Sequence, residues 1–255
     1  MTRASFQKGV FDYYKKHKRN FPWRRTQNPY HILVSEIMLQ QTQVARVIPK
    51  YKLFLKKFST VKHLARASQK DVLRMWLGLG YNRRALYLHK AAKIIVNEHG
   101  GVVPNTIEEL IRLPGVGKNT AGAILAFAFN KPVVFIETNI RSVFLHHFFK
   151  NKKNISDEAV LKLIRKTLPE KNIREWYSTL MDYGVYLKNS VGNPNIKSKH
   201  YIRQGEFKGS DREVRGVIMK AIVLERKPEE VRIKLGIKSK RFGKILLKLR
   251  REGLI

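Results

Sequence analysis

The sequence predicts an all-α protein with one large helical domain and a small basic helical module at its C-terminal end. Three observations favour this fold class. Apolar residues recur at the spacing of amphipathic helices along most of the 255 residues. Serine or threonine precedes several of these runs with an acidic residue three positions later, which is the pattern of an N-terminal capping box. Glycine and proline mark the places where the helices end.

The balance of charges indicates a polyanionic partner. The chain has 52 lysines and arginines against 19 aspartates and glutamates, a formal net charge of +33. Self-repulsion of this size is tolerated mainly when phosphates offset it, so nucleic acid is the natural partner. A membrane is not expected, because the sequence has no apolar run of about 18 residues and no signal-peptide pattern. We therefore expect a soluble, cytoplasmic, nucleoid-associated monomer.

Cysteine is absent from the sequence. Its absence excludes disulfides, thiolate nucleophiles and any zinc or iron–sulfur centre held by cysteine. The eight histidines do not replace it, because His146 and His147 are adjacent rather than one helical turn apart and the others are scattered. We expect no metal ion held by side chains.

The N-terminal part predicts two helices separated by an aromatic and basic loop. Residues 5–18 carry apolar side chains at helical spacing, and the pattern resumes over 30–44. In the loop between them, Trp23 is suited to stacking on a base, and Arg24 and Arg25 to meeting phosphates. The alternative is that Trp23 belongs to the core and that Arg24 and Arg25 are merely solvated. The sequence of this loop, taken alone, favours the alternative.

One carboxylate, Glu36, lies among the apolar residues of the helix expected over 30–44. Burial would raise its pKa towards that of a proton donor. Helical periodicity alone instead favours a position on the solvent-facing side. Gln40 and Gln41 follow, and each offers paired donor and acceptor atoms suited to base edges.

Residues 42–58 predict an amphipathic helix whose apolar stripe belongs to the core. A later helix ends in the sequence GLGY at 78–81. The glycines on either side of Leu79 would let a hydrophobic wedge and the aromatic ring of Tyr81 approach a duplex closely, next to the arginines at 83–84. A glycine cap with a packed leucine is an equally good interpretation.

The stretch LPGVGKNTAGAI at 113–124 predicts a helix-hairpin-helix over 107–129. A turn at Gly115 and Gly117 leaves no room for larger side chains. The two glycines expose backbone N–H groups at a helix N-terminus, where the helix dipole attracts a phosphate. An ordinary helix–helix connection is the alternative.

Four apolar residues at 133–136 run directly into Glu137, ahead of a helix expected over 140–149. A carboxylate near a helix start is favoured by the dipole, so Glu137 is interpreted as an N-terminal cap. The functional interpretation is a second carboxylate, kept ionised there and facing the mouth of the hairpin. Two helices follow over 156–168 and 174–187, and Asp182 on the second is expected to be structural.

The apolar period fails over 189–209, which predicts a linker between a domain over 1–188 and a module over 210–255. The module has the order helix, short helix, glycine turn and basic helix, which is typical of a helix-turn-helix or winged-helix domain. Five basic residues lie off the last apolar stripe and are available to phosphates: Lys238, Lys240, Arg241, Lys244 and Lys248. A three-helix bundle packed on the main domain is the alternative.

Five motifs taken together resemble the helix-hairpin-helix (HhH-GPD) DNA glycosylases. They are FPWR at 21–24, SEIMLQQTQV at 35–44, GLGY at 78–81, LPGVGKNTAGAI at 113–124 and ETN at 137–139, in the order and spacing of that family. The chain most closely resembles the adenine glycosylases that act opposite guanine or 8-oxoguanine. The resemblance extends from about Phe21 to Tyr186 and implies a two-lobed helical fold.

The resemblance also implies roles for individual residues. Glu36 takes the place of the general acid that protonates the purine at N7. Glu137 falls where the family has the aspartate that stabilises the oxocarbenium-like sugar, and Asn139 matches a residue that orients the site. The base-pocket candidates are Asn119, Trp23 and Arg24. The DNA-binding candidates are Gln41, Thr42, Leu79, Tyr81, Gly115, Gly117, Lys118 and Thr120. The hairpin backbone carbonyls would hold Na+ or K+.

The chain departs from the family pattern at three places. Glu137 is one methylene longer than the family's aspartate, and about 1 Å of misplacement can lower a rate roughly a hundredfold. Asn119 stands where bifunctional relatives have a lysine nucleophile, so we expect no Schiff base and no strand cleavage. Residues 188–209 replace the four-cysteine iron–sulfur loop, and no longer domain for reading 8-oxoguanine follows.

We therefore expect a monofunctional DNA glycosylase that removes adenine mispaired with guanine or 8-oxoguanine. This chemistry needs a base out of the stack, one protonated carboxyl and one ionised carboxylate. Glu36 and Glu137 are expected to converge around that nucleotide. The alternatives are a thymine or uracil glycosylase acting on T:G or U:G mismatches, and a non-catalytic binder of distorted DNA.

Overall fold

The computed structural model describes residues 2–255 and confirms the all-α fold class, because the described residues form helices and no strand. The chain divides into two compact units. Unit 1 comprises the chain up to Leu33, Asn105–Arg112 and Val116–Arg203, and unit 2 comprises Val34–Pro104, Leu113–Gly115 and Gln204–Ile255. Within the described residues, no helix combines the length and apolar character that a membrane span requires.

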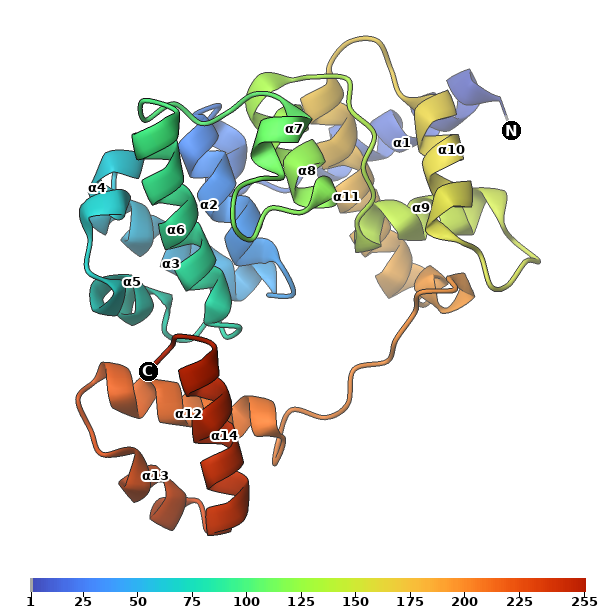
Figure 1. The fold of residues 1–255 in the computed structure, drawn as a ribbon. Coiled ribbons are helices and arrows are strands. Elements are labelled where there is room, and N and C mark those ends of the chain that lie inside the picture. Colours follow the sequence, from blue (N-terminus) through green and yellow to red (C-terminus); the bar gives the residue numbers. More distant parts are fainter. Residues whose placement is uncertain (1) are drawn as a thin grey trace. The chain divides into compact units, whose positions relative to one another are not determined.

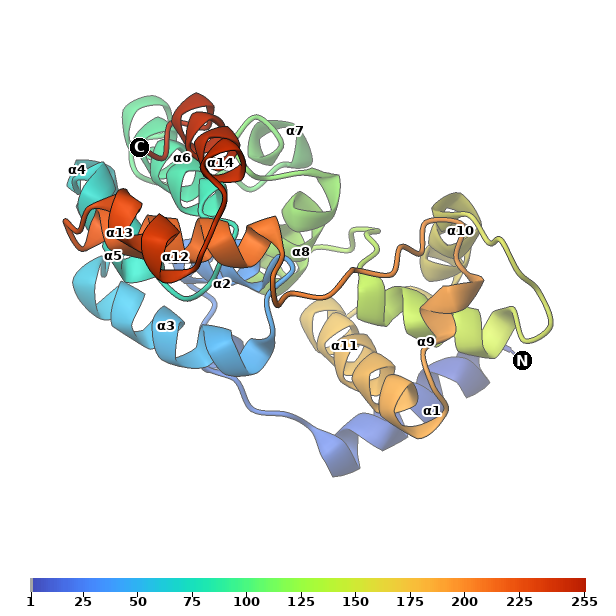
Figure 2. The ribbon, with the colours of Figure 1, turned by 90° about the horizontal axis from the view of Figure 1, so that it is seen from below.

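Unit 1 is built around the longest helix, α11. Its helices are α1 (Arg3–His17), η1 (Pro22–Arg25), α7 (Ile107–Leu110), α8 (Lys118–Phe129), α9 (Thr138–Phe148), α10 (Asp157–Thr167), α11 (Ile173–Ser190) and η2 (Pro194–Lys197). Helix α11 packs against α9, α1 and α8, and Figure 2 shows α1, α9 and α11 side by side. The fully buried rings of Trp176, Tyr177 and Phe135 fill this core, with Tyr177 and Phe135 centred 4.2 Å apart.

Unit 2 packs a layer of short helices against α6. Its helices are α3 (Val44–Lys57), α4 (Val61–Arg66), α5 (Gln69–Trp76), α6 (Arg83–Glu98), α12 (Asp211–Val223), α13 (Pro228–Lys234) and α14 (Ser239–Arg251). Helix α6 contacts α4 and α5 (Figure 1), and the fully buried Trp76 and Phe54 meet edge to face. The helix α2 (Pro29–Leu39) crosses from unit 1 into unit 2.

The predicted helix starts are confirmed by capping bonds. The side chains of Ser68, Thr106 and Ser210 each accept a hydrogen bond from the backbone N–H three residues later. These bonds satisfy N–H groups that lack a partner within the helix. The apolar stripe predicted over 42–58 is also confirmed as core, through the buried side chains of α3.

Two predicted segments differ from the structure. The helix expected over 30–44 ends at Leu39, because Gln41 has a left-handed backbone (φ +53°) and α3 begins only at Val44. The expected linker over 189–209 is partly structured. Helix α11 continues to Ser190, and η2 packs against α9, so sequence without apolar periodicity still docks through polar side chains.

The C-terminal module has the predicted order of two helices, a glycine turn and a basic third helix. Phe242, Ile245 and Leu249 of α14 are buried within it, as their spacing predicts. Residues 204–255 contain no strand, so the described module is a three-helix unit without a wing. Figure 1 shows α12, α13 and α14 packed together.

Candidate functional site

Glu137 is the N-terminal cap of α9. Its Oε2 accepts a hydrogen bond from the backbone N–H of Asn139 at 3.3 Å, and its Oε1 accepts one from Nδ2 of the same residue at 3.2 Å. Burial raises the pKa of Glu137 above its usual value, while these bonds and the nearby charges of Lys188 and Arg141 lower it. The net shift of this pKa is upward, because burial outweighs the contributions that lower it, and the ionised state expected from sequence stays a prediction.

Lys188 of α11 extends this cluster. Its Nζ donates to Oδ1 of Asn139 at 3.0 Å, which orients the amide so that Nδ2 faces Glu137. Burial lowers the pKa of Lys188, and the negative charge of Glu137 opposes that effect. A cation therefore lies close enough to Glu137 to favour its ionised form.

Gly184 lets α11 approach the start of α9 closely. A Cβ at this position would lie 2.1 Å from the backbone oxygen of Asn139, which no real side chain can do without displacing α9. Helix α11 therefore fixes Asn139 both through this backbone contact and through Lys188.

Asn195 of η2 holds the first turn of α9 from another direction. Its side chain is 3% exposed, and Nδ2 donates to the backbone oxygen of Thr138 at 3.2 Å and to Oγ of Ser142 at 2.6 Å. The backbone of Ile155 also bonds to Lys197 and Lys199 on either side. This segment, which the family resemblance places at the position of an iron–sulfur loop, is thus an ordered polar clasp on α9.

Asn119 near the start of α8 also lies beside this cluster. Its Oδ1 accepts a hydrogen bond from the backbone N–H of Ile136 at 3.3 Å, directly before Glu137. On the same helix, Gly122 leaves space for the side chain of Phe135. A Cβ added to Gly122 would lie only 2.7 Å from the Cβ of Phe135. The structure therefore brings together three predicted site residues of unit 1: Asn119, Glu137 and Asn139.

The hairpin turn depends on one glycine rather than two. Gly115 has φ +81°, and a Cβ there would lie 2.9 Å from Cβ of Tyr87. Gly117 caps α8 with an ordinary φ of −88°, and a Cβ there would meet nothing within 4 Å. Gly117 and Lys118 are exposed, and Thr120 is half-buried.

Glu36 lies on the part of α2 that belongs to unit 2. It is half-buried between Ser35 and Ile37, whose side chains are fully buried. Its environment is thus less exposed than helical periodicity alone predicts.

Arg84 organises the turns around this helix. It is 8% exposed, and its Nη1 donates to the backbone oxygens of Ile37 and Met38 at 2.9 Å each. Its Nη2 donates to Oγ1 of Thr42 at 2.9 Å and to the backbone oxygen of Gly80 at 3.0 Å. Burial lowers the pKa of Arg84 to about 10. Arg84, which looks exposed in sequence, is therefore buried, and its guanidinium is used for internal hydrogen bonds.

The GLGY turn presents Tyr81 and buries Leu79. Leu79 is 1% exposed, which favours the packed leucine over the wedge, whereas Tyr81 is 43% exposed with a left-handed backbone. The Tyr81 hydroxyl accepts a hydrogen bond from Gln204 at 2.9 Å. Gln41 is exposed and Thr42 is half-buried, so the turn between α2 and α3 presents polar groups to solvent.

Trp23 and Arg24 are anchored inside unit 1. Trp23 is buried and stacks on Phe21, as the structural interpretation of the loop predicts. Arg24 is not simply solvated, because it makes a two-point ion pair with the buried Asp182, at 2.7 and 2.9 Å. Arg19 shares the same carboxylate, so Asp182 has the structural role expected from sequence. Base-pocket roles for Trp23 and Arg24 stay predictions.

Sequence reasoning missed four residues that hold these elements: Arg84, Gly184, Lys188 and Asn195. Each of these residues contacts a segment distant in sequence or bonds to backbone atoms. Neither apolar periodicity nor a short motif predicts such contacts. Only Gly184 carried a signal, as a glycine in the middle of a strongly helical stretch.

Within residues 2–255, no group of three or more histidine, aspartate or glutamate side chains is placed to hold a metal ion. The monovalent cation implied by the family resemblance would instead need backbone carbonyls of the hairpin. That site stays a prediction.

The chain is similar to known proteins along most of its length. It is 37% identical over 192 residues to an adenine DNA glycosylase of Buchnera aphidicola (subsp. Baizongia pistaciae), covering 73% of this chain and 54% of that protein. It is 46% identical over 132 residues to an adenine DNA glycosylase of Mycobacterium tuberculosis, covering 51% and 43%. A solved thermostable thymine-DNA glycosylase superposes with a TM-score of 0.64 at 27% identity, covering 71% of this chain and 85% of that one.

The chain spans about half the length of the curated relatives it matches. The family model described as the HhH-GPD superfamily base excision DNA repair protein matches residues 34–170, which include Glu36, the hairpin and Glu137. Since this match covers more than half of the 255 residues, the chain belongs to the HhH-GPD superfamily of base excision DNA repair proteins.

Proposed function

We propose that this chain is a monofunctional DNA glycosylase of base excision repair that removes adenine mispaired with guanine or 8-oxoguanine. The observation that carries the proposal is that the family match includes both candidate carboxylates, Glu36 and Glu137. The names of the relatives support adenine as the base. We further propose that it acts as a monomer on mismatched duplex DNA in the cytoplasm.

In the proposed reaction, the target nucleotide leaves the stack before its glycosidic bond breaks. Glu36 gives a proton to N7 of the base, so the base departs as a neutral leaving group. The bond between C1′ and N9 breaks, and the negative charge of Glu137 stabilises the cationic sugar. Water then adds to C1′ and gives a proton to the Glu36 carboxylate, which returns that group to its acid form. Asn139 holds the Glu137 carboxylate in place through its two hydrogen bonds.

A single-turnover assay tests this proposal. Duplexes carrying A:8-oxoG, A:G, T:G and U:G pairs are incubated with excess protein and then treated with alkali, which cleaves abasic sites. We expect abasic product from the two adenine duplexes, and no strand cleavage before alkali because Asn119 replaces the lysine nucleophile. Borohydride, which traps Schiff bases, is expected to trap none.

A second candidate is favoured by one observation, the likeness to the thymine-DNA glycosylase structure. Product from T:G or U:G alone would support that candidate and contradict adenine excision. Tight binding of a mismatch without product from any duplex would instead indicate a non-catalytic binder, which the longer side chain of Glu137 leaves open.

Removal of the Lys188 charge is expected to change the pH dependence of excision. Excision needs ionised Glu137, so the rate falls as the pH drops through the pKa of that group. Lys188 lowers this pKa. In the Lys188→Met variant the pKa of Glu137 rises, so the acid limb of the pH–rate profile moves to higher pH.

The Lys188→Arg variant keeps the charge and is the matched control, with an acid limb near that of the parent. Thermal unfolding of both variants separates this effect from a loss of folded protein. If the acid limb of the pH–rate profile were the same in Lys188→Met as in the parent, Lys188 would not lower the pKa of Glu137.

A further inference from the structure

The turn between α13 and α14 has the form of a helix-turn-helix. Residues 235–238 connect the two helices, Gly236 is left-handed (φ +60°), and Ile237 is buried beneath the turn. The backbone N–H of Ile237 bonds to the oxygen of Arg232 at 3.0 Å and closes the end of α13. In helix-turn-helix proteins, the helix after such a turn is the one that enters the major groove of DNA.

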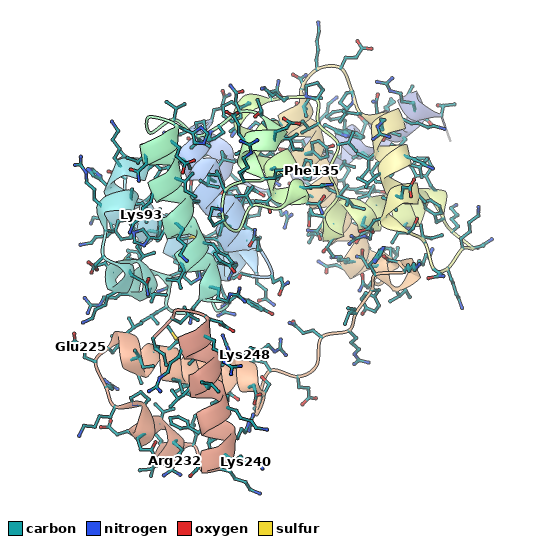
Figure 3. All side chains as sticks on the ribbon, viewed as in Figure 1. Lys93, Phe135, Glu225, Arg232, Lys240 and Lys248 are labelled. Carbon is teal, nitrogen blue, oxygen red and sulfur yellow. The ribbon has the colours of Figure 1, made fainter. Side chains whose placement is uncertain are left out.

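The face of α14 opposite its buried stripe is basic. Its exposed basic residues are Lys240, Lys244, Lys248 and Arg251. Gly243 and Leu247 are exposed along one edge of this face, and Leu247 is 49% exposed although it is apolar. Figure 3 shows Lys240 near the start of α14 and Lys248 near its end. We call this surface the α14 basic face.

Charge in the module is segregated. Helix α14 contains six lysines and arginines and no acidic residue. Three acidic side chains of the module are paired with cations outside the lysines of this face: Asp211 with Arg241, Glu252 with Arg215, and Glu229 with Arg232. Arg241 pairs with Asp211 of α12, so it is left out of the α14 basic face, and its availability to phosphates stays a prediction. No ion pair within residues 2–255 involves the lysines of the α14 basic face.

We propose that the α14 basic face is a second DNA-binding surface, which docks α14 in the major groove of undamaged duplex DNA. The lysines meet phosphates on the two sides of the groove. Gly243 allows the helix backbone to come close to the bases, and Leu247 fits the thymine methyl groups that line the groove floor. Duplex RNA does not fit this surface, because its major groove is too narrow to admit a helix.

Binding of the full-length protein to a short undamaged DNA duplex tests the proposal. Fluorescence anisotropy is measured between about 50 and 200 mM salt for the parent and for the triple variant Lys240→Gln, Lys244→Gln, Lys248→Gln. Each lost phosphate contact lowers the log–log salt slope by about 0.9. We expect the slope to become shallower by about 2 to 3 and the affinity at low salt to fall at least about tenfold.

The matched control removes three exposed lysines of unit 1, as Lys152→Gln, Lys153→Gln, Lys166→Gln, with the same change in net charge. It is expected to lower the slope by less than about 1. Equal effects in both triple variants would overturn the proposal, because they would show a response to net charge alone. An equal loss of duplex RNA binding in the α14 variant would also overturn it, since it would show a general polyanion surface.

A second pair of variants tests groove insertion without changing charge. Gly243→Leu is favourable for a helix but adds a bulky side chain at the edge of the α14 basic face, so we expect weaker duplex binding. Gly216→Leu changes an exposed glycine of α12 and is expected to leave binding unchanged. Parental affinity in Gly243→Leu would contradict insertion of α14. Single-turnover excision with saturating protein is measured separately, so failure of this inference does not depend on the outcome for excision.

Discussion

The Glu36→Gln variant is expected to excise its base about 10²- to 10⁴-fold more slowly than the parent, because a carboxamide has no proton to give to the leaving base. The amide keeps the size of the side chain and its hydrogen-bonding capacity, so the local packing of α2 is expected to survive. The measurement is the single-turnover rate at saturating protein, on whichever duplex the parent converts to abasic product.

Glu98→Gln, an exposed change of the same chemistry at the end of α6, is the control and is expected to retain the parental rate. Affinity for the mismatched duplex is measured in parallel and is expected to stay close to that of the parent. Excision by Glu36→Gln at the parental rate would remove Glu36 as the general acid. If the excision rate fell only in proportion to the affinity for the mismatched duplex, Glu36 would contribute to DNA binding rather than to proton transfer.

The Arg84→Met variant is expected to lower the free energy of unfolding by about 3 kcal/mol, the largest effect on stability that we expect. Methionine fills the space of the aliphatic stem but donates no hydrogen bonds. The backbone oxygens of Ile37, Met38 and Gly80 would then be buried without these partners. The measurement is urea unfolding followed by circular dichroism.

Arg83→Met is the matched control, because Arg83 is the exposed neighbour on the same helix. Its free energy of unfolding is expected to change by less than about 0.5 kcal/mol. The Arg84→Lys variant retains the charge but has fewer hydrogen-bond donors. We expect its loss in the free energy of unfolding to lie between those of Arg84→Met and Arg83→Met. Equal stability of Arg84→Met and Arg83→Met would show that the internal bonds of Arg84 contribute nothing net.

Local patterns predicted the helices well, because each helix start and end is determined within a few residues. The capping side chains of Ser68, Thr106 and Ser210 lie where their spacing predicts. The apolar stripe of α14 is buried for the same reason, since its period matches that of the helix. The helices could therefore be predicted from these local signals without knowing which other helices pack against them.

The partners of polar side chains could not be predicted in the same way. Arg84 follows a glycine-rich turn and looks exposed in sequence, yet it bonds to oxygens more than 40 positions away. Leu79, between two glycines, is compatible with both a wedge and a packed leucine, and only its burial distinguishes them. Apolar periodicity says nothing about which backbone oxygens need a donor.

The candidate site was partly predictable. Glu137 was identified as a cap from its place before a helix, and its bonds to Asn139 are those of a cap. The rise in its pKa was not predictable, because burial depends on α11 packing against α9. Lys188 and Gly184 affect this carboxylate only after the chain has folded.

The clasp formed by Asn195 has a consequence for the conditions in which the protein can fold. An amide side chain and backbone bonds secure the beginning of α9, and the sequence offers no thiolate there. Peroxide, nitric oxide and chelators, which dismantle clusters held by sulfur, have no such target in this chain. The beginning of α9 is therefore held by hydrogen bonds of an amide side chain, which need no iron to form.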